Sequence, residues 1–158
     1  MAPEADRAVR VYFAAPLFTQ AERRWNRELA RQIESELGCT VVLPQDICVG
    51  GKKNAPRHFA QIHHTCIEGV KSCDAMVAIL DGADADSGTA FEVGYAYALG
   101  KPVIAVRTDY RKQQERGTNL MLARGCQAYV SFLAFNEDVA QLGAEVARKL
   151  RILLRSRR

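Results

Sequence analysis

Short apolar runs alternate along the chain with segments in which apolar residues recur at helical spacing. Five runs are too short for helices, which predicts buried strands at residues 9–15, 41–43, 75–80, 103–106 and 128–132. Trp25, Leu29, Ile33 and Leu37 step by four, as expected for the buried face of a helix. Similar patterns predict further helices at residues 59–73, 88–99 and 139–153.

This alternation predicts an α/β fold of the flavodoxin or Rossmann-like type, a three-layer sandwich with a five-stranded, mainly parallel sheet. In such folds ligands bind at the carboxyl ends of the strands. The segments 15–19, 81–89 and 107–121 follow predicted strands, so we expect their polar residues to converge there. Because the sequence contains no linker, repeat or low-complexity tract, we expect a single domain over residues 1–158.

Composition excludes several classes of protein. Of the 158 residues, 48% are hydrophobic and 25% are charged, as in globular proteins, and no apolar run approaches the roughly 20 residues of a membrane span. The acidic residues Glu4 and Asp6 and the short apolar segment that follows do not fit a signal peptide, so we expect a cytoplasmic protein without a membrane partner. The five cysteines are irregularly spaced and are expected to be free thiols.

The net charge of +4 is concentrated at the end of the last predicted helix, in residues 148–158. A solvated helix end explains this cluster better than binding to a nucleic acid polymer does. The segment 110–116 is also basic, and it is either a polar loop or a site that attracts phosphate.

The densest polar cluster follows the third predicted strand and contains Asp81, Asp84, Asp86, Ser87, Gly88 and Thr89. A Mg²⁺ site would use such carboxylates. A phosphate-binding P-loop is excluded because its G-x-x-x-x-G-K-[ST] pattern is absent. The cluster is otherwise an acidic surface loop in which Asp86 or Ser87 caps the next helix.

Glu92 lies in that helix among mostly small and apolar residues. A carboxylate in such a setting needs either a partner or a function. Its position alone leaves two interpretations open: a functional group in the cleft, or a residue near the helix start that is stabilised by the helix dipole.

Three ordered motifs resemble those of the nucleoside 2-deoxyribosyltransferase family. Residues 86–102 read DSGTAFEVGYAYALGKP and are similar to the family signature. Residues 11–18, VYFAAPLF, are similar to its first strand and substrate loop, and residues 119–122, NLML, to its N-L-M motif. The resemblance extends from about residue 10 to residue 132.

The resemblance implies a base-exchange reaction in which the glutamate matching Glu92 attacks the anomeric carbon of a nucleoside. A covalent glycosyl-enzyme forms, and the sugar passes to a second base with retention of configuration, while water competes as a side reaction. The aspartate matching Asp86 holds the sugar hydroxyls and the nucleophile, and the tyrosine matching Tyr12 positions the glutamate. Without the resemblance, Tyr12 would be interpreted as a core tyrosine.

The resemblance also implies a homo-oligomer whose subunits share active sites. In the family, the residue matching Asn119 reaches across a subunit interface and binds the 5′-hydroxyl of the sugar in the neighbouring active site. The other expected substrate contacts are Phe13, Phe18, Gln45, Gly88 and Met121. Without the resemblance, Asn119 could begin a short helix and Met121 could pack in the core. Gln45 could be a polar residue of a turn. The substrates are a nucleoside and a free nucleobase, and no metal or organic cofactor is needed.

One position departs from the family pattern. Many members carry an aspartate or asparagine that contacts the base where this chain has Cys66. A thiol is a poor hydrogen-bond partner, so His63, His64 or Gln45 would have to replace it, although solvent-facing histidines are the simpler interpretation.

Two other functions remain as hypotheses. A nucleoside 5′-monophosphate N-glycosidase would hold phosphate with Ser87, Thr89 and the basic segment 107–116. The negative charge of Asp86 argues against a nearby phosphate. A non-catalytic nucleotide-binding module is disfavoured because both Glu92 and Asp86 are retained.

Overall fold

The computed structural model describes residues 7–47, 56–111, 117–131, 135 and 138–156. Its centre is a five-stranded sheet in which every pairing is parallel, in the order β2-β1-β3-β4-β5. The strands are β1 (Arg10–Ala14), β2 (Thr40–Val42), β3 (Ala75–Ile79), β4 (Val103–Arg107) and β5 (Ala128–Ser131). The predicted fold class is confirmed, and the sheet is wholly rather than mainly parallel.

The four predicted helices are present as α1 (Gln20–Leu37), α3 (Pro56–Ser72), α4 (Ser87–Ala98) and α6 (Val139–Arg155). Two short helices, α2 (Pro44–Ile47) and α5 (Leu120–Gly125), have too few residues to show a helical period in the sequence. Among the described residues, no helix is both long enough and apolar enough to cross a membrane.

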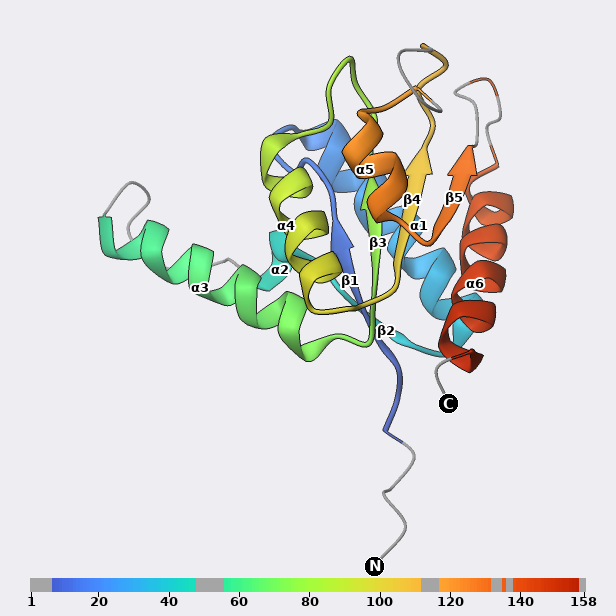
Figure 1. The fold of residues 1–158 in the computed structure, drawn as a ribbon, viewed down its shortest axis with the longest axis horizontal. Helices are drawn as coiled ribbons and strands as arrows, with labels where there is room; N and C mark the ends of the chain where they lie inside the picture. Colours follow the sequence, from blue (N-terminus) through green and yellow to red (C-terminus); the bar gives the residue numbers. More distant parts are fainter. Residues whose placement is uncertain (1–6, 48–55, 112–116, 132–134, 136–137, 157–158) are drawn as a thin grey trace, which may run out of the picture.

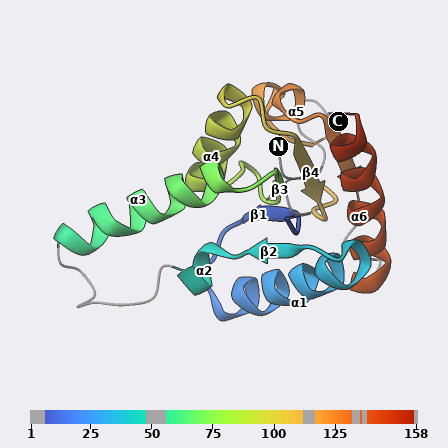
Figure 2. The ribbon, with the colours of Figure 1, turned by 90° about the horizontal axis from the view of Figure 1, so that it is seen from below.

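The helices cover both faces of the sheet, with α1 and α6 on one side and α3, α4 and α5 on the other (Figures 1 and 2). Successive side chains of a strand point to opposite faces. In β1, Val11 and Phe13 therefore enter the core under α1 and α6, whereas Tyr12 and Ala14 enter the core under α4. This alternation decides which residues of β1 can reach a site beside α4.

The strand order places a crevice at one edge of the sheet. The chain after β1 leads through α1 to β2 on one side, and the chain after β3 leads through α4 to β4 on the other side, so the loops after β1 and β3 diverge at their carboxyl ends. Such a switch point is the usual ligand site of open parallel sheets. The segments after these two strands lead into α1 and α4.

The contact between α1 and α6 is close enough to require glycine. A Cβ atom added to Gly143 would lie 2.4 Å from the Gln32 Cβ and 3.3 Å from the Gln32 carbonyl carbon. We predict that Gly143→Ala lowers the free energy of unfolding by about 1–3 kcal/mol, despite the better helix propensity of alanine. Urea denaturation measures this change.

Gly94 in α4 is a suitable control, because a Cβ added there meets no atom within 4 Å. Gly94→Ala should leave stability unchanged or raise it by up to about 1 kcal/mol. Equal stabilities of the two variants would contradict close packing of α1 on α6.

Candidate active site

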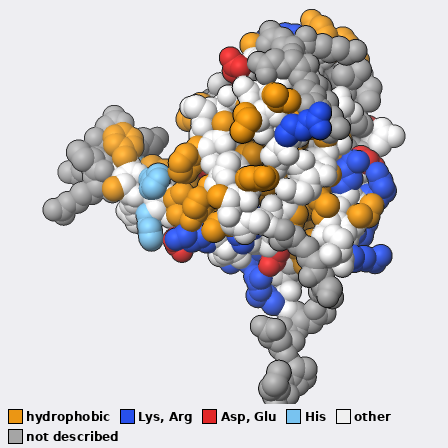
Figure 3. Space-filling view, in the orientation of Figure 1, with side chains coloured by type: hydrophobic (Ala, Val, Ile, Leu, Met, Phe, Trp, Pro, Cys, Tyr) orange, Lys and Arg blue, Asp and Glu red, His pale blue; other side chains and the backbone are white. Residues whose placement is uncertain are grey.

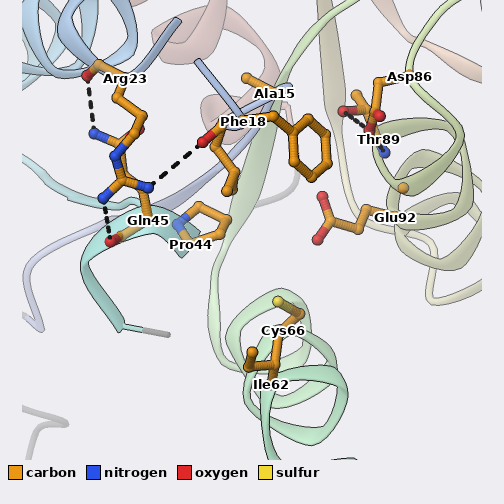
Figure 4. A pocket seen from close by; sticks show the side chains of 12 residues that line it. Ala15, Phe18, Arg23, Pro44, Gln45, Ile62, Cys66, Asp86, Thr89 and Glu92 are labelled. Atoms are coloured by element: carbon orange, nitrogen blue, oxygen red, sulfur yellow. Dashed lines mark hydrogen bonds between the residues drawn. The ribbon is translucent and has the colours of Figure 1, made fainter. Parts of the chain in front are cut away.

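A pocket of about 740 Å³ lies at the carboxyl end of β1, between the start of α4 and the middle of α3 (Figure 4). This volume suits a small organic ligand. Its walls are mostly apolar, with charged groups from α1 and α4. The lining residues are Ala15, Leu17, Phe18, Arg23, Pro44, Gln45, Ile62, Cys66, Asp86, Gly88, Thr89 and Glu92.

Glu92 enters this pocket from the second turn of α4 and accepts a hydrogen bond at Oε1 from the Tyr12 hydroxyl, over 2.6 Å. Tyr12 is fully buried. Burial raises the pKa of the Glu92 carboxyl to about 7; the Tyr12 hydroxyl opposes this rise, and the charge of Asp86 adds to it. Burial and the nearby carboxylate raise the pKa of Tyr12 far above its usual value, so Tyr12 remains a donor.

Asp86 is the N-cap of α4 and also lines the pocket. Its Oδ2 accepts hydrogen bonds from the Thr89 backbone nitrogen, over 2.8 Å, and from the Thr89 hydroxyl, over 3.1 Å. The capping interpretation from the sequence therefore describes this residue correctly. Because Asp86 lies beside Glu92 at the pocket wall, the cap also holds a carboxylate at a fixed place near the ligand.

Gln45 lines the pocket, but its amide group is engaged by the protein. Its Nε2 donates to the Arg23 carbonyl oxygen over 2.9 Å, and its Oε1 lies 3.4 Å from the Asn26 amide nitrogen. The Arg23 guanidinium in turn donates to the carbonyl oxygens of Gln45, over 3.2 Å, and Leu17, over 3.5 Å. Arg23 is a cation in the pocket wall that sequence reasoning missed, because one charged residue in an amphipathic helix carries no distinguishing signal.

The two expected phenylalanines have different positions. Phe18 lines the pocket with 76% of its surface exposed, at the loop that leads into α1 (Figure 4). Phe13 is fully buried in the core under α1 and α6, on the opposite face of the sheet from Tyr12. The structure therefore does not bring Phe13 to the pocket, because adjacent residues of a strand point in opposite directions.

Asn119 and Met121 lie at the start of α5 and are exposed; neither lines the pocket of this chain. The Asn119 Oδ1 accepts from the Met121 backbone nitrogen over 2.9 Å, so Asn119 does begin a short helix. Met121 is 79% exposed and does not fill core. This cap engages the side-chain oxygen of Asn119 and not its amide nitrogen.

A model of the nucleoside 2-deoxyribosyltransferase family matches residues 11–121, a range that contains the first two motifs and reaches into the third. The chain belongs to this family. Membership confirms the resemblance seen in the sequence and the expectation of an enzyme of the N-glycosyl transferase and N-glycosidase class. Among curated proteins, none matches the chain.

The chain is similar to three solved structures in both sequence and fold. A conserved protein from Enterococcus faecalis V583 is 29% identical with a TM-score of 0.71, and the match covers 90% of this chain and 99% of that one. The 2-deoxyribosyltransferase of Bacillus psychrosaccharolyticus is 26% identical, with a TM-score of 0.66 and coverage of 85% and 90%. A 2-desoxiribosyltransferase from Leishmania mexicana is 26% identical, with a TM-score of 0.60 and coverage of 78% and 91%.

Cys66, the departure from the pattern of the nucleoside 2-deoxyribosyltransferase family, is part of the pocket wall. Its side chain interacts with the Tyr12 hydroxyl, so the thiol lies next to the Tyr12–Glu92 pair. His63 and His64 are exposed and do not line the pocket, and the His63 ring lies 6.3 Å from the Phe91 ring between centroids. The structure thus brings neither histidine to the place of Cys66.

The acidic residues after β3 do not form a metal centre. Asp81 accepts from the backbone nitrogens of Thr108 and Asp109, over 2.6 and 3.0 Å, so its carboxylate joins two loops. Within the described ranges of the chain, no group of three histidine, cysteine or acidic side chains is placed to hold a metal ion. The geometry of these residues thus favours the capping interpretation for Asp86, and the structure adds the contact by which Asp81 joins two loops.

The raised pKa of Glu92 predicts a pH-dependent stability. The carboxyl titrates near pH 7 in the folded chain and near 4.5 when unfolded, so the folded state loses stability as the pH rises between these values. Glu92→Gln removes this cost and still accepts a hydrogen bond from Tyr12. The variant should be more stable than wild type above pH 7 by up to about 3 kcal/mol, and this difference should vanish near pH 4.

Denaturation midpoints between pH 4 and pH 8 measure this difference. The control is Glu145→Gln, since Arg148 lowers the pKa of the partly exposed Glu145 and no gain with rising pH is expected there. A constant difference between Glu92→Gln and wild type over this range would show that Glu92 does not titrate near 7.

Proposed function

We propose that this enzyme exchanges the base of a 2-deoxynucleoside through a covalent glycosyl-Glu92 intermediate, with hydrolysis as a side reaction. The observation that carries this proposal is the Tyr12–Glu92 hydrogen bond of 2.6 Å at the wall of the pocket. It fixes a half-buried carboxylate beside a cavity large enough for a nucleoside.

In the first step an oxygen of the Glu92 carboxylate attacks the anomeric carbon. The N-glycosidic bond breaks, its electron pair leaves with the base, and the departing base takes up a proton from solvent. In the second step a nitrogen of another base attacks the same carbon, gives up its proton to solvent and releases the Glu92 carboxylate. Each step inverts the configuration at the anomeric carbon, so the two steps together retain it. If water attacks in place of the second base, the result is hydrolysis.

The Tyr12 hydroxyl has two effects on this nucleophile. Because it binds Oε1, it restricts rotation of the carboxylate and leaves Oε2 for the attack. It also lowers the pKa of Glu92, against the effect of burial, so that more of the carboxylate is ionised at neutral pH.

Asp86 and Gly88 lie at the start of α4, on the same wall as Glu92. This position supports a role for Asp86 in binding the sugar hydroxyls and for Gly88 as a close backbone contact. Phe18 supplies an aromatic surface for the base at the pocket rim. Gln45 has an indirect role in this proposal, because its amide group is hydrogen-bonded to Arg23 and Asn26.

The exposed positions of Asn119 and Met121 support a homo-oligomer with shared active sites. Large hydrophobic side chains are exposed on the face of α4 and α5 seen in Figure 3, and an exposed apolar patch is typical of a protein interface. The exposed large hydrophobic residues of these helices are Phe91, Tyr97, Leu120 and Met121. In the proposed assembly, Asn119 binds the 5′-hydroxyl and Met121 covers the base in the pocket of a neighbouring subunit.

The contacts of the loop after β4 disfavour a 5′-monophosphate N-glycosidase. Arg107 is buried and engaged by carbonyl oxygens, and Arg111 pairs with Asp109. The remaining basic residues of this loop, within 112–116, lie outside the described residues. The hydroxyl of Thr89 is bound to Asp86, whose charge opposes phosphate.

A transfer assay tests the proposal. Purified protein is incubated with a deoxynucleoside and a different free base, and the products are separated by chromatography. We expect a new deoxynucleoside, at a rate at least 1,000-fold lower for Glu92→Ala because the nucleophile is lost. Base release from deoxynucleoside monophosphates without transfer would instead support the N-glycosidase, and no turnover of either substrate would support a binding module.

Tyr12→Phe tests the positioning role. Loss of the hydroxyl removes the interaction that lowers the pKa of Glu92, so the acid limb of the kcat/KM profile should move to higher pH. At neutral pH, kcat/KM should fall about tenfold, as expected for the loss of one hydrogen bond to a charged group. Tyr110→Phe is the control, because Tyr110 is exposed, does not line the pocket and should show neither change.

A further inference from the structure

Arg107 is a buried cation at the end of β4, with 2% of its surface exposed, and it lies outside the pocket. We propose that Arg107 is a positioning residue that fixes Asn119 for binding the sugar 5′-hydroxyl. This inference rests on the proposed function, in which Asn119 makes that contact. It assigns a role to a side chain that no motif of the sequence includes.

The Arg107 guanidinium is anchored at the end of β3. Its Nη1 donates to the Leu80 carbonyl oxygen over 2.5 Å, and its Nη2 to the Gly82 carbonyl oxygen over 3.2 Å. β3 and β4 are paired in the middle of the sheet, so this anchor belongs to the most constrained part of the fold.

The same guanidinium also contacts both described ends of the loop that leads to α5. Nη2 donates to the Arg111 carbonyl oxygen over 3.0 Å. Gly117 packs so closely that a Cβ there would lie 2.7 Å from the Arg107 Nε, and its φ of 83° is in the region that favours glycine. Asn119 follows two residues later, so the Arg107–Gly117 contact sets where α5 begins.

Among the described residues of the loop, other hydrogen bonds with the end of β3 and the segment after it hold the first part, at Thr108 and Asp109. Asp81 accepts from the backbone nitrogens of Thr108 and Asp109, and Asp109 accepts from the Gly82 backbone nitrogen over 3.1 Å. Arg107 is the side chain that joins β3 to Gly117 as well. A displacement of about 1 Å in a substrate-binding group can reduce turnover by up to about 100-fold, so this link has a direct consequence for catalysis.

The experiment compares Arg107→Met, Asn119→Ala and the double variant on a 2-deoxynucleoside and on its analogue without the 5′-hydroxyl. We expect Arg107→Met to lower kcat/KM about tenfold for the nucleoside, and less than about twofold for the analogue. The double variant should be no worse than Asn119→Ala, because both substitutions remove the same contact. A residue needed only for stability would lower activity equally on both substrates.

Folding is monitored by thermal unfolding of each variant. If Arg107→Met does not fold, Gly117→Ala takes its place, since the added Cβ displaces the loop from the guanidinium while Arg107 is retained. Arg107→Lys keeps the charge but cannot donate to three carbonyl oxygens in the same geometry, and should give an intermediate loss.

The outcomes separate the inference from the function on which it rests. If Asn119→Ala distinguishes the two substrates and the Arg107 and Gly117 variants do not, the positioning role is wrong and the proposed function stands. Additive losses in the double variant would also overturn the positioning role. If Asn119→Ala affects both substrates equally, the proposed contact with the 5′-hydroxyl is wrong, and the inference falls with it.

Discussion

The hydrogen bond from Tyr12 to Glu92 is the interaction on which the site depends. It joins a residue of β1 to a residue of α4 that lies 80 positions later in the chain, and it exists only when α4 packs on the sheet in the correct register. A half-buried carboxylate without this partner would be costly. The bond therefore links correct folding of the α4 face to the placement of the proposed nucleophile.

The same edge of the sheet brings together groups from three separate loops. Asp86 caps α4, and Gln45 holds Arg23 in the pocket wall. Asp81 and Arg107 join the loops after β3 and β4. Each of these polar side chains bonds to backbone or amide groups, so the loops at this edge of the sheet are held by hydrogen bonds of polar side chains.

Cys66 gives this pocket a character that differs from the family pattern. Cys66, Ile62 and Leu17 form an apolar part of the pocket wall. The charged groups of the pocket come from α1 and the start of α4. The cation of this wall is Arg23, held by two carbonyl oxygens. At this wall the pocket therefore offers a ligand apolar surface and one guanidinium.

The sequence by itself determined the parallel sheet, its four long helices and the candidate nucleophile, because apolar periodicity and the motif around Glu92 are local properties. Only the tertiary structure decided that Tyr12 reaches Glu92 while Phe13 enters the opposite core, since the face of a strand is set by packing on both sides. It also revealed Arg23 and Arg107. Their roles come from contacts with carbonyl oxygens of distant residues, and hydrogen bonding to the backbone leaves no trace in side-chain patterns.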